Sequence, residues 1–500
     1  MPVLRSRLVP TAARDELAAA LTALHDELDL PDDFPPAVLA EADAAARSVP
    51  VDPAAAGLAD LRGIPFVTID PPGSTDLDQA LHLERTAGGA VLHYAIADVP
   101  AFVEPGGAVD AEARERGQTL YAADRRIPLH PEVLSEDAAS LLADRDRRAY
   151  VWRFELDDGA RPTATTLTRA VIRSRAQWSY ADAQAAVDGG TAPEAFAALP
   201  WFGAERSARE SERGGASLNL PETRVVAEPE GAPARGDDEP AEIRDGHGAY
   251  RLERDPGLPI EDWNAHVSLL TGMAAADIML RGGIGILRTM PPASAEDVAA
   301  FRTQTVALGE PWREDVTYGD YLQRLGRGPV PRAIREAAAG LFRGAGYVAF
   351  DGEPPADPDQ AAIGAPYAHA TAPLRRLIDR WSLVICEALA NGHPVPEWAR
   401  ESLPELPRLM ARSAQRASRL DADTLDRVAA AVLHGREGEI LTGAVLRVRR
   451  GTARVQLRRP PIVVSVPALD VAPGALVRLR LDATSIADGT STFSRVDATS

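Results

Sequence analysis

The chain has 500 residues, of which 45% are hydrophobic, and this composition excludes a disordered protein. Its formal charge is −19, from 73 acidic residues against 54 basic residues that are all arginine. The length exceeds what one ordinary core holds, so we expect two or more domains. The single cysteine, Cys386, excludes a disulfide framework and favours a reducing compartment.

The beginning of the chain carries no sign of export or membrane insertion. Residues 1–17 lack the apolar core of a signal peptide, and no apolar run approaches the about 20 residues of a membrane span. We therefore expect a cytoplasmic monomer without membrane attachment or a disulfide-linked partner. Residues 1–57 predict helices, because Thr11 can cap one segment and Pro35-Pro36 can open a second, alanine-rich one.

A buried strand is predicted at residues 65–69, and three aspartates follow it. Asp70 comes directly after the strand, and a Pro-Pro-Gly turn separates it from Asp76 and Asp78. Asp76 and Asp78 project to the same side of an extended chain, where they can meet Asp70. Oxygen ligands of this kind suit Mg²⁺ or Mn²⁺. The alternative is an ordinary turn, because the same residue types are common in turns.

Further elements follow in chain order. Residues 91–99 predict a second strand, which we expect to pair with the first. The acidic, Pro- and Gly-rich residues 227–257 predict a solvated loop. Apolar residues from 260 to 278 recur at helical spacing, and Gly282-Gly283 ends that helix.

An arginine pair marks the second half of the chain. Pro373 predicts the first turn of a helix, which places Arg375 and Arg376 where free backbone N–H groups also favour anions. The alternative partner for this pair is Asp379, in a buried salt bridge. Residues 400–435 are predicted to be helical, with arginines near one face that is either solvated or the wall of a channel.

The last part of the chain changes to alternating polar and apolar residues. From His434 to Ser500 there are ten arginines against six acids, a local charge of +4 that leaves −23 for the rest. Short alternating segments with glycine turns from residue 439 onward predict a small β-barrel of the OB or S1 type. We expect an α+β protein overall.

These motifs together resemble the ribonuclease II family, whose catalytic domain is called RNB. The three aspartates form the pattern D-x5-D-x-D, with Gln79 where the family usually has a fourth acid. Arg116 to Tyr121 is similar to the family's RG-x-x-x-Y. Tyr367 to Arg380 resembles its Y-x-H-x-T-S-P-I-R-R-Y-x-D.

The resemblance implies roles for these residues. Asp78 and Arg375 are the implied catalytic residues, with Arg375 holding the scissile phosphate opposite the metal. The implied base-stacking residue is Tyr121, since an exposed ring can grip any base. The alternative for Tyr121 is half-buried packing. In full, the implied metal ligands are Asp70, Asp76, Asp78 and Gln79, and the implied RNA contacts are Tyr121, Tyr180, His369, Thr371 and Arg376.

The resemblance implies a hydrolytic 3′→5′ exoribonuclease that removes nucleoside 5′-monophosphates processively from the 3′ end of single-stranded RNA with Mg²⁺. We expect no N-terminal cold-shock domains, since nothing at the start of the chain alternates like strands. The expected division is an N-terminal helical region (1–57), an RNB-like catalytic domain (58–395), a helical extension (396–435) and an OB/S1-like barrel (436–500).

Two other functions remain open at this level. A different aspartate-based phosphotransfer fold would place a lysine downstream, and the chain has none. A catalytically impaired RNA-binding or regulatory protein is favoured by Gln79 and by the acidic overall charge. An assay of RNA cleavage distinguishes an active exoribonuclease from a catalytically impaired RNA-binding protein.

Overall fold

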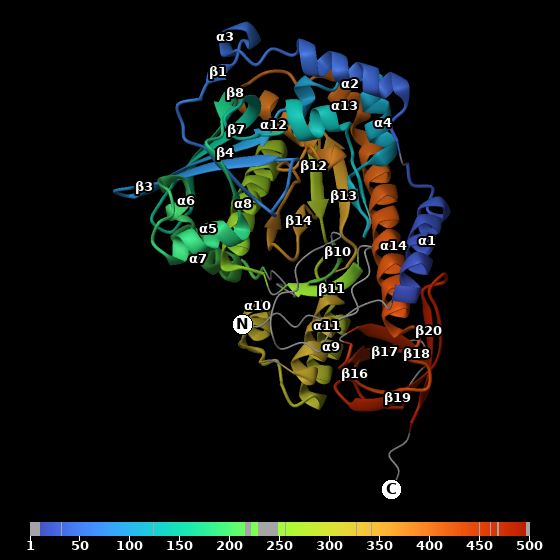
Figure 1. Ribbon diagram of the computed structural model, residues 1–500. Helices are drawn as coiled ribbons and strands as arrows, with labels where there is room; N and C mark the ends of the chain where they lie inside the picture. The colour runs from blue at the N-terminus through green and yellow to red at the C-terminus, as the bar shows by residue number, and fades with distance from the viewer. Residues whose placement is uncertain are drawn as a thin grey trace.

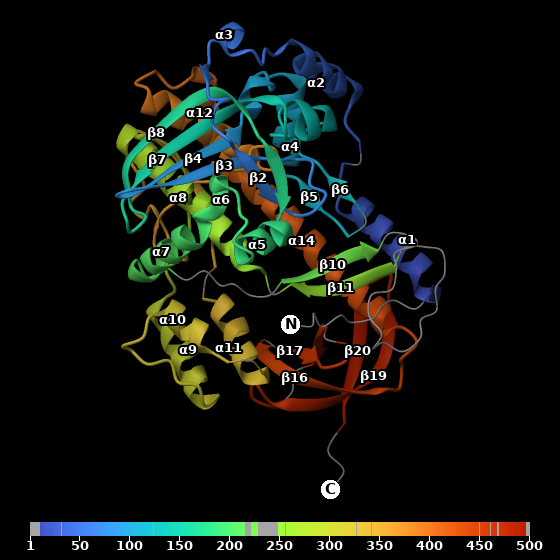
Figure 2. The ribbon, with the colours of Figure 1, turned by 60° about the vertical axis from the view of Figure 1, so that its left-hand side comes forward.

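A seven-stranded mixed sheet forms the largest layer of the computed structural model (Figure 1, Figure 2). The order is β1 (Ala59–Asp60), β8 (Pro162–Arg173), β7 (Asp146–Leu156), β4 (Gly89–Ala97), β3 (Gln79–Thr86), β2 (Val67–Asp70) and β9 (Ala176–Ser179). The structure describes residues 11–496 except 32, 124, 216–221, 229–248, 256, 327, 342, 450, 461 and 468–469.

The predicted first strand is β2, but its expected partner is wrong. The sequence predicted pairing with residues 91–99, which form β4. In the structure β3 lies between them, antiparallel to both. The chain turns between Asp70 and Asp78 and forms β3 directly afterwards, so the nearest strand in sequence takes the pairing position. On its other side β2 runs parallel to β9, with Asp70 opposite Ser179.

Helices cover the two faces of the sheet, because alternate strand residues enter different cores. Leu81 and Leu92 pack with α8 (Pro259–Gly282) and α12 (Leu377–Ala390). Ala80 and Ala95 face the opposite side and pack with α2 (Pro36–Ser48) and α4 (Ala108–Arg116). The predicted long helix is α8, and it ends at Gly283, which adopts the left-handed conformation with φ of 70°.

The prediction of a loop over residues 227–257 is wrong at its described ends. Strands β10 (Glu222–Glu228) and β11 (Ala249–Asp255) form an antiparallel pair. Each contains alternating or β-branched residues that the surrounding Pro, Gly and acidic residues obscured in the sequence. The part of the prediction that falls on residues 229–248 and 256 lies outside the described residues.

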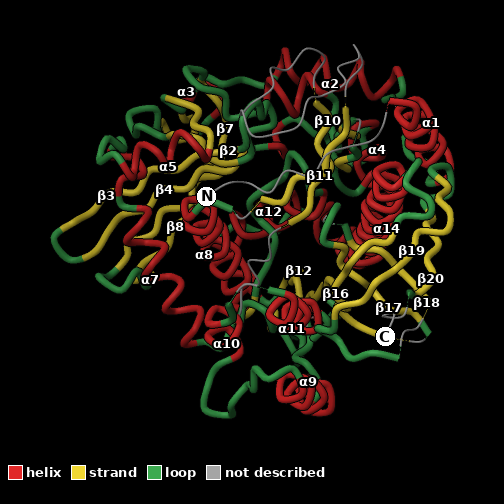
Figure 3. The backbone as a smooth tube through the Cα atoms, turned by 60° about the horizontal axis from the view of Figure 1, so that its bottom comes forward, coloured by secondary structure: helices red, strands yellow, loops and turns green. Residues whose placement is uncertain are grey.

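The C-terminal part is a five-stranded antiparallel sheet in the order β18 (Val463–Pro467), β17 (Thr452–Leu457), β16 (Ile440–Arg449), β19 (Leu476–Ser485) and β20 (Thr490–Arg495). Its apolar residues share one core with α1 (Thr11–Glu27) and the end of α14 (Leu406–Leu433). Figure 1 and Figure 3 show α1 beside α14, next to this sheet. The α+β prediction is confirmed.

None of the described helices is both long and apolar enough to cross a lipid bilayer.

The other helices and strands complete the layers and connections. The remaining bounds are α3 (Pro53–Ala56), α5 (Tyr180–Asp188), α6 (Glu194–Ala197), α7 (Leu199–Glu212), α9 (Ala295–Ala307), α10 (Tyr318–Arg324), α11 (Pro329–Ala339), α13 (Glu397–Ser402), β5 (Leu120–Tyr121), β6 (Arg126–Ile127), β12 (Ile284–Thr289), β13 (Gly346–Asp351), β14 (Asp359–Gln360) and β15 (Ala365–Pro366).

Two histidines lie opposite each other on β3 and β4. His82 and His93 are register partners whose ring centroids are 6.3 Å apart, and the buried Nδ1 atom of each has no hydrogen-bond partner. Burial, together with the positive charges of protonated His82 and Arg153, lowers the pKa of His93 to about 4. The folded protein therefore holds His93 neutral where an unfolded chain would protonate it.

This pair predicts a pH-dependent stability. As pH falls from about 6.5 toward 4, unfolding takes up a proton on His93, so the free energy of unfolding should fall by on the order of 1–3 kcal/mol. Urea titrations across this range measure the slope. His93→Phe should have a shallower slope, and the same change at exposed His393 should leave it unaltered. Equal slopes for His93→Phe and wild type would refute the assignment.

Candidate active site

Asp70 ends β2 and supplies a buried carboxylate. Its Oδ2 atom is buried and has no hydrogen-bond partner. Burial and the nearby charge of Asp76, opposed by Arg375, raise the pKa of Asp70 to about 7. A buried carboxylate without a partner is costly, so this position calls for a proton or a cation.

Asp76 and Asp78 lie on either side of Leu77, which anchors the turn. Leu77 is buried, and its N–H donates to Ser140 Oγ over 2.9 Å. Asp78 is 5% exposed, and burial raises its pKa to about 8. Asp76 is less buried and forms an ion pair with Arg126, whose Nη1 lies 2.9 Å from Asp76 Oδ1. The turn thus divides its two carboxylates between different partners.

Asp78 connects the aspartate turn to the arginine segment. Leu374 N–H donates to Asp78 Oδ1 over 2.7 Å, and Arg375 Nε lies 3.5 Å from Asp78 Oδ2. The side chain of Arg375 remains 43% exposed, whereas the side chain of Asp78 is only 6% exposed. The two predicted catalytic residues therefore meet at one place, with the arginine still accessible.

Gln79 forms a second connection between the same segments. Its Oε1 accepts a hydrogen bond of 2.6 Å from the Tyr94 hydroxyl, and its Nε2 donates to the Thr371 carbonyl over 2.6 Å. Tyr94 also shares a hydrogen bond of 2.8 Å with Ser268 of α8. Both ends of the amide are engaged with protein groups. The structure therefore gives Gln79 a bridging role, and a role as metal ligand stays a prediction.

The helix predicted to begin around Pro373 begins later, at Leu377. Pro373 to Arg375 form a turn, and Arg376 is extended and bridges to Gln118. The prediction that both arginines lie in the first helical turn is therefore wrong. Asp379 explains the difference. Its buried carboxylate accepts hydrogen bonds from the loop that precedes the helix, and this holds the loop in a non-helical conformation.

Asp379 accepts hydrogen bonds from the N–H groups of Thr371 and Ala372, over 2.9 and 2.6 Å. Arg376 also pairs with it, through an Nη2–Oδ2 distance of 2.8 Å. The alternative reading of the arginine pair is thus correct for Arg376, which forms the salt bridge with Asp379. Arg375 does not share it and points to Asp78 instead.

His369 and Thr371 line the same loop. His369 Nδ1 shares a hydrogen bond of 2.7 Å with the Tyr347 hydroxyl. Burial lowers the pKa of His369 far below its ordinary value, and Arg376, Arg288 and Arg375 add to the shift. His369 is therefore neutral. Thr371 is 3% exposed. Both side chains order the loop in this structure.

The two tyrosines predicted to contact RNA differ in exposure. Tyr121 is 54% exposed, and it lies close enough to Asp76, Asp78 and Arg375 to interact with their charges. Tyr180 begins α5, with Ser179 as N-cap, and is half-buried near Asp70 because β9 ends beside β2. Tyr121 therefore offers a ring face to solvent beside the carboxylates, whereas Tyr180 is partly packed.

Arg126 is a site residue that was not predicted from the sequence. It lies directly opposite Tyr121 in the short β5–β6 pair and contacts both Asp76 and Glu136. The residues between Tyr121 and Arg126 contain none of the glycine-containing pairs that signal a hairpin, so the sequence carries no indication of this pairing. On α14, Arg412 lies 3.0 Å from Glu115 Oε2, so the arginine-rich face of that helix is partly used in surface ion pairs.

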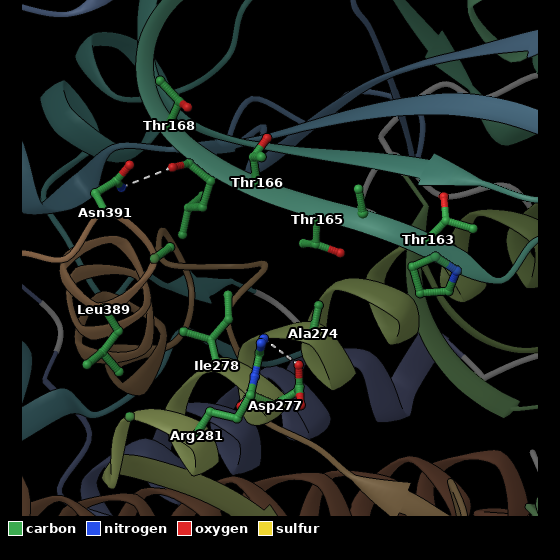
Figure 4. Close-up of a pocket in the computed structure, with 15 residues that line it drawn as sticks. Thr163, Thr165, Thr166, Thr168, Ala274, Asp277, Ile278, Arg281, Leu389 and Asn391 are labelled. Carbon is green, nitrogen blue, oxygen red and sulfur yellow. Dashed lines mark hydrogen bonds and ion pairs between the residues drawn. The ribbon is translucent and has the colours of Figure 1, made fainter.

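A separate pocket of about 800 Å³ lies away from these residues, between β8, α8 and the end of α12 (Figure 4). Thr163, Thr165 and Thr166 line it from β8, and Asn391 donates a hydrogen bond to the Leu167 carbonyl at its edge. None of the predicted site residues lines it.

The aspartates fit a hard divalent cation in the chemistry of their donors. Asp70 offers an unpartnered oxygen, and burial disfavours the charges of Asp70 and Asp78 when no cation balances them. In the described part of the chain, no three His, Cys, Asp or Glu side chains are placed to hold a metal by themselves. Mg²⁺ usually binds through one or two carboxylates with water and substrate phosphates, so this arrangement suits it.

Comparison with known proteins places these residues in a family. The RNB domain matches residues 58–389, and the RNase II-type exonuclease C-terminal S1 domain matches residues 439–496. Human exosome complex exonuclease RRP44 is 36% identical over 170 residues, 33% of this chain and 18% of that protein. Ribonuclease R of Escherichia coli is 37% identical over 153 residues, 30% of this chain and 19% of that protein. The matched part is thus less than a fifth of either relative's length.

Solved structures share the fold at low sequence identity. Mycoplasma genitalium RNase R in complex with ribose methylated single-stranded RNA has a TM-score of 0.82 and 16% identity, over 96% of this chain and 78% of that chain. Yeast Ssd1, described as a pseudonuclease, has a TM-score of 0.61 and 17% identity, over 85% of this chain and 51% of that chain. Because the RNB match covers more than half of its length, the chain belongs to the RNB-domain family.

Proposed function

We propose that the protein is a hydrolytic exoribonuclease that shortens single-stranded RNA from its 3′ end and releases nucleoside 5′-monophosphates processively. The observation that carries this proposal is the junction of Asp78 with Leu374 and Arg375, which brings together segments 296 residues apart. Carboxylates that can hold a divalent cation, beside an accessible guanidinium, are suited to stabilise the charge that develops in phosphodiester hydrolysis. We also propose the cytoplasm as its location.

Asp70, Asp76 and Asp78 would hold Mg²⁺, with Mn²⁺ as the alternative. The cation would supply charge to polarise the phosphoryl group and to lower the pKa of a water molecule. Asp70 is suited to this position because its buried oxygen lacks a partner. Gln79 keeps Thr371 and the following loop against the aspartate turn, so it positions Arg375 indirectly.

Arg375 would stabilise negative charge on the phosphoryl oxygens. It is exposed, and its ion pair with Asp78 holds the guanidinium beside the carboxylates. Arg376 would act through the loop, since its charge is used by Asp379. Tyr121 would stack on a base near the 3′ end and accept any of the four bases. His369 and Thr371 would support the loop that faces the RNA.

Three relatives support RNA as the substrate, and one supports an alternative. The Mycoplasma genitalium structure holds single-stranded RNA, and the curated relatives are named exonuclease and ribonuclease. The likeness to yeast Ssd1, a pseudonuclease, favours a second candidate function. In that case the chain would bind RNA without cleaving it.

A cleavage assay separates the two functions. Pure protein is incubated with a 5′-labelled oligoadenylate and Mg²⁺, and the products are resolved by length. Conversion of full-length RNA to short 5′-labelled end products with few intermediates, with release of 5′-AMP, supports the processive exoribonuclease. Binding without shortening supports the impaired protein instead.

Asp78→Asn should abolish turnover while RNA affinity stays within about tenfold of wild type, ~1.4 kcal/mol. The amide keeps the size of the side chain and can still accept from Leu374 N–H, but it loses the charge that faces Arg375. Single-turnover cleavage and fluorescence anisotropy with the same RNA measure both quantities. Joint loss of binding and of the cooperative melting transition would show that Asp78 is structural.

Tyr121→Leu should weaken binding of oligoadenylate by about 1–3 kcal/mol, because it removes one base–aromatic stack. Tyr121→Phe is the matched control and should bind like wild type, since it keeps the ring. Anisotropy titrations in EDTA compare the three proteins without cleavage. If the leucine variant binds as tightly as the phenylalanine variant, Tyr121 does not stack on a base.

A further inference from the structure

The side chain of Arg126 contacts two carboxylates that lie on different segments. Nη1 lies 2.9 Å from Asp76 Oδ1, and Nη2 pairs with Glu136. Glu136 belongs to a single π-helical turn, Val133–Ala138, that packs beside the aspartate turn. One guanidinium is therefore shared between a proposed metal ligand and a carboxylate with no role in the proposed chemistry.

Glu136 is held at a fixed distance from the aspartate turn. Thr75 Oγ1 donates to Glu136 Oε2 over 2.6 Å, and Ser140 Oγ donates to the Thr75 carbonyl over 2.6 Å. The residue before Asp76 is thus tied to the segment that carries Glu136. Arg126 can give up its contact with Asp76 and keep a charged partner, because Glu136 stays within reach.

The charges at this place do not balance without a cation. When all are ionised, the carboxylates of Asp70, Asp76, Asp78 and Glu136 face the guanidiniums of Arg126 and Arg375. The excess is two negative charges, which is the charge of one divalent cation. Arg126 occupies Asp76 Oδ1, so a cation that binds through this oxygen must displace the guanidinium, and one that binds through Oδ2 would meet its positive charge.

We propose that Arg126 competes with the divalent cation for Asp76 and, once displaced, contacts the RNA backbone. This inference rests on the metal site of the proposed function. The side chain of Arg126 is 26% exposed and lies opposite Tyr121 in the β5–β6 pair. Cross-strand partners project to the same face, so a nucleotide whose base stacks on Tyr121 would bind on the face that carries Arg126. Arg126 is a positioning residue that links cation binding to RNA binding.

The first measurement is Mn²⁺ binding to RNA-free protein, followed by electron paramagnetic resonance. Arg126→Gln should bind Mn²⁺ roughly threefold or more tightly than wild type, because the competing charge is gone. Arg126→Lys should return toward the wild-type affinity. Arg145→Gln removes an exposed arginine that pairs only distantly with Asp137, and it should change the affinity much less.

A double-mutant cycle separates direct competition from a general field effect. If Arg126 acts by occupying Asp76, then Arg126→Gln should give no gain in Mn²⁺ affinity when Asp76→Asn is already present. An equal gain in both backgrounds would overturn the proposal. Thermal melting of each variant verifies that it is folded.

The second measurement is binding of a ribose-methylated oligoadenylate with and without Mn²⁺. Arg126→Gln should weaken RNA binding by roughly threefold or more in Mn²⁺ and much less in EDTA, because only the displaced guanidinium is free for phosphate. Equal losses in both conditions would contradict the exchange. If wild type binds no Mn²⁺, the proposed metal site itself fails; if it binds Mn²⁺ and Arg126→Gln changes nothing, only the role of Arg126 fails.

Discussion

The junction between Asp78 and the loop before α12 is the constraint on which the site depends. One carboxylate accepts a backbone N–H from Leu374 and faces the guanidinium of Arg375. Gln79 donates a second hydrogen bond to the same loop, at the Thr371 carbonyl, and Asp379 accepts a hydrogen bond from the Thr371 N–H. Because all of these contacts are buried or half-buried, loss of one partner would leave an unpaired polar group in a dry environment. The site is rigid on this side and accessible at Arg375.

Burial gives the carboxylates their unusual properties. Asp70 and Asp78 are removed from water and carry pKa values raised by that burial, whereas Asp76 stays nearer the surface with Arg126. Three aspartates that look equivalent in the sequence therefore have three different environments. A cation that bridges the three carboxylates would meet a different free-energy cost at each of them. The most exposed one, Asp76, is already paired with Arg126.

Much of the architecture could be predicted from local patterns. The strand before Asp70, the helix ended by Gly283 and the alternation of the C-terminal strands are signals within short windows, and the structure has each of them. The insertion of β3 between β2 and β4 could not be read this way, because strand neighbours are chosen by the tertiary structure.

The site shows the same division. The meeting of Asp78 and Arg375 followed from a resemblance in motif order. The late start of α12 followed from Asp379, whose hydrogen bonds to Thr371 and Ala372 depend on how its buried side chain packs. Arg126 and Glu136 were invisible for that reason as well. Nothing in their local sequence indicates that they share a guanidinium contact across the aspartate turn.

Helix α1 and the C-terminal sheet share one apolar core, although they come from opposite parts of the chain. Leu17 and Leu21 of α1 lie against Val428 and Val432 of α14, together with residues of the five-stranded sheet. The sheet is consequently not an independent domain joined to the rest by a linker. Proteolytic removal or deletion of α1 would expose the apolar surface that this helix covers on the C-terminal sheet. The first effects would be aggregation and a weaker attachment of that sheet, before the carboxylates of the site were disturbed.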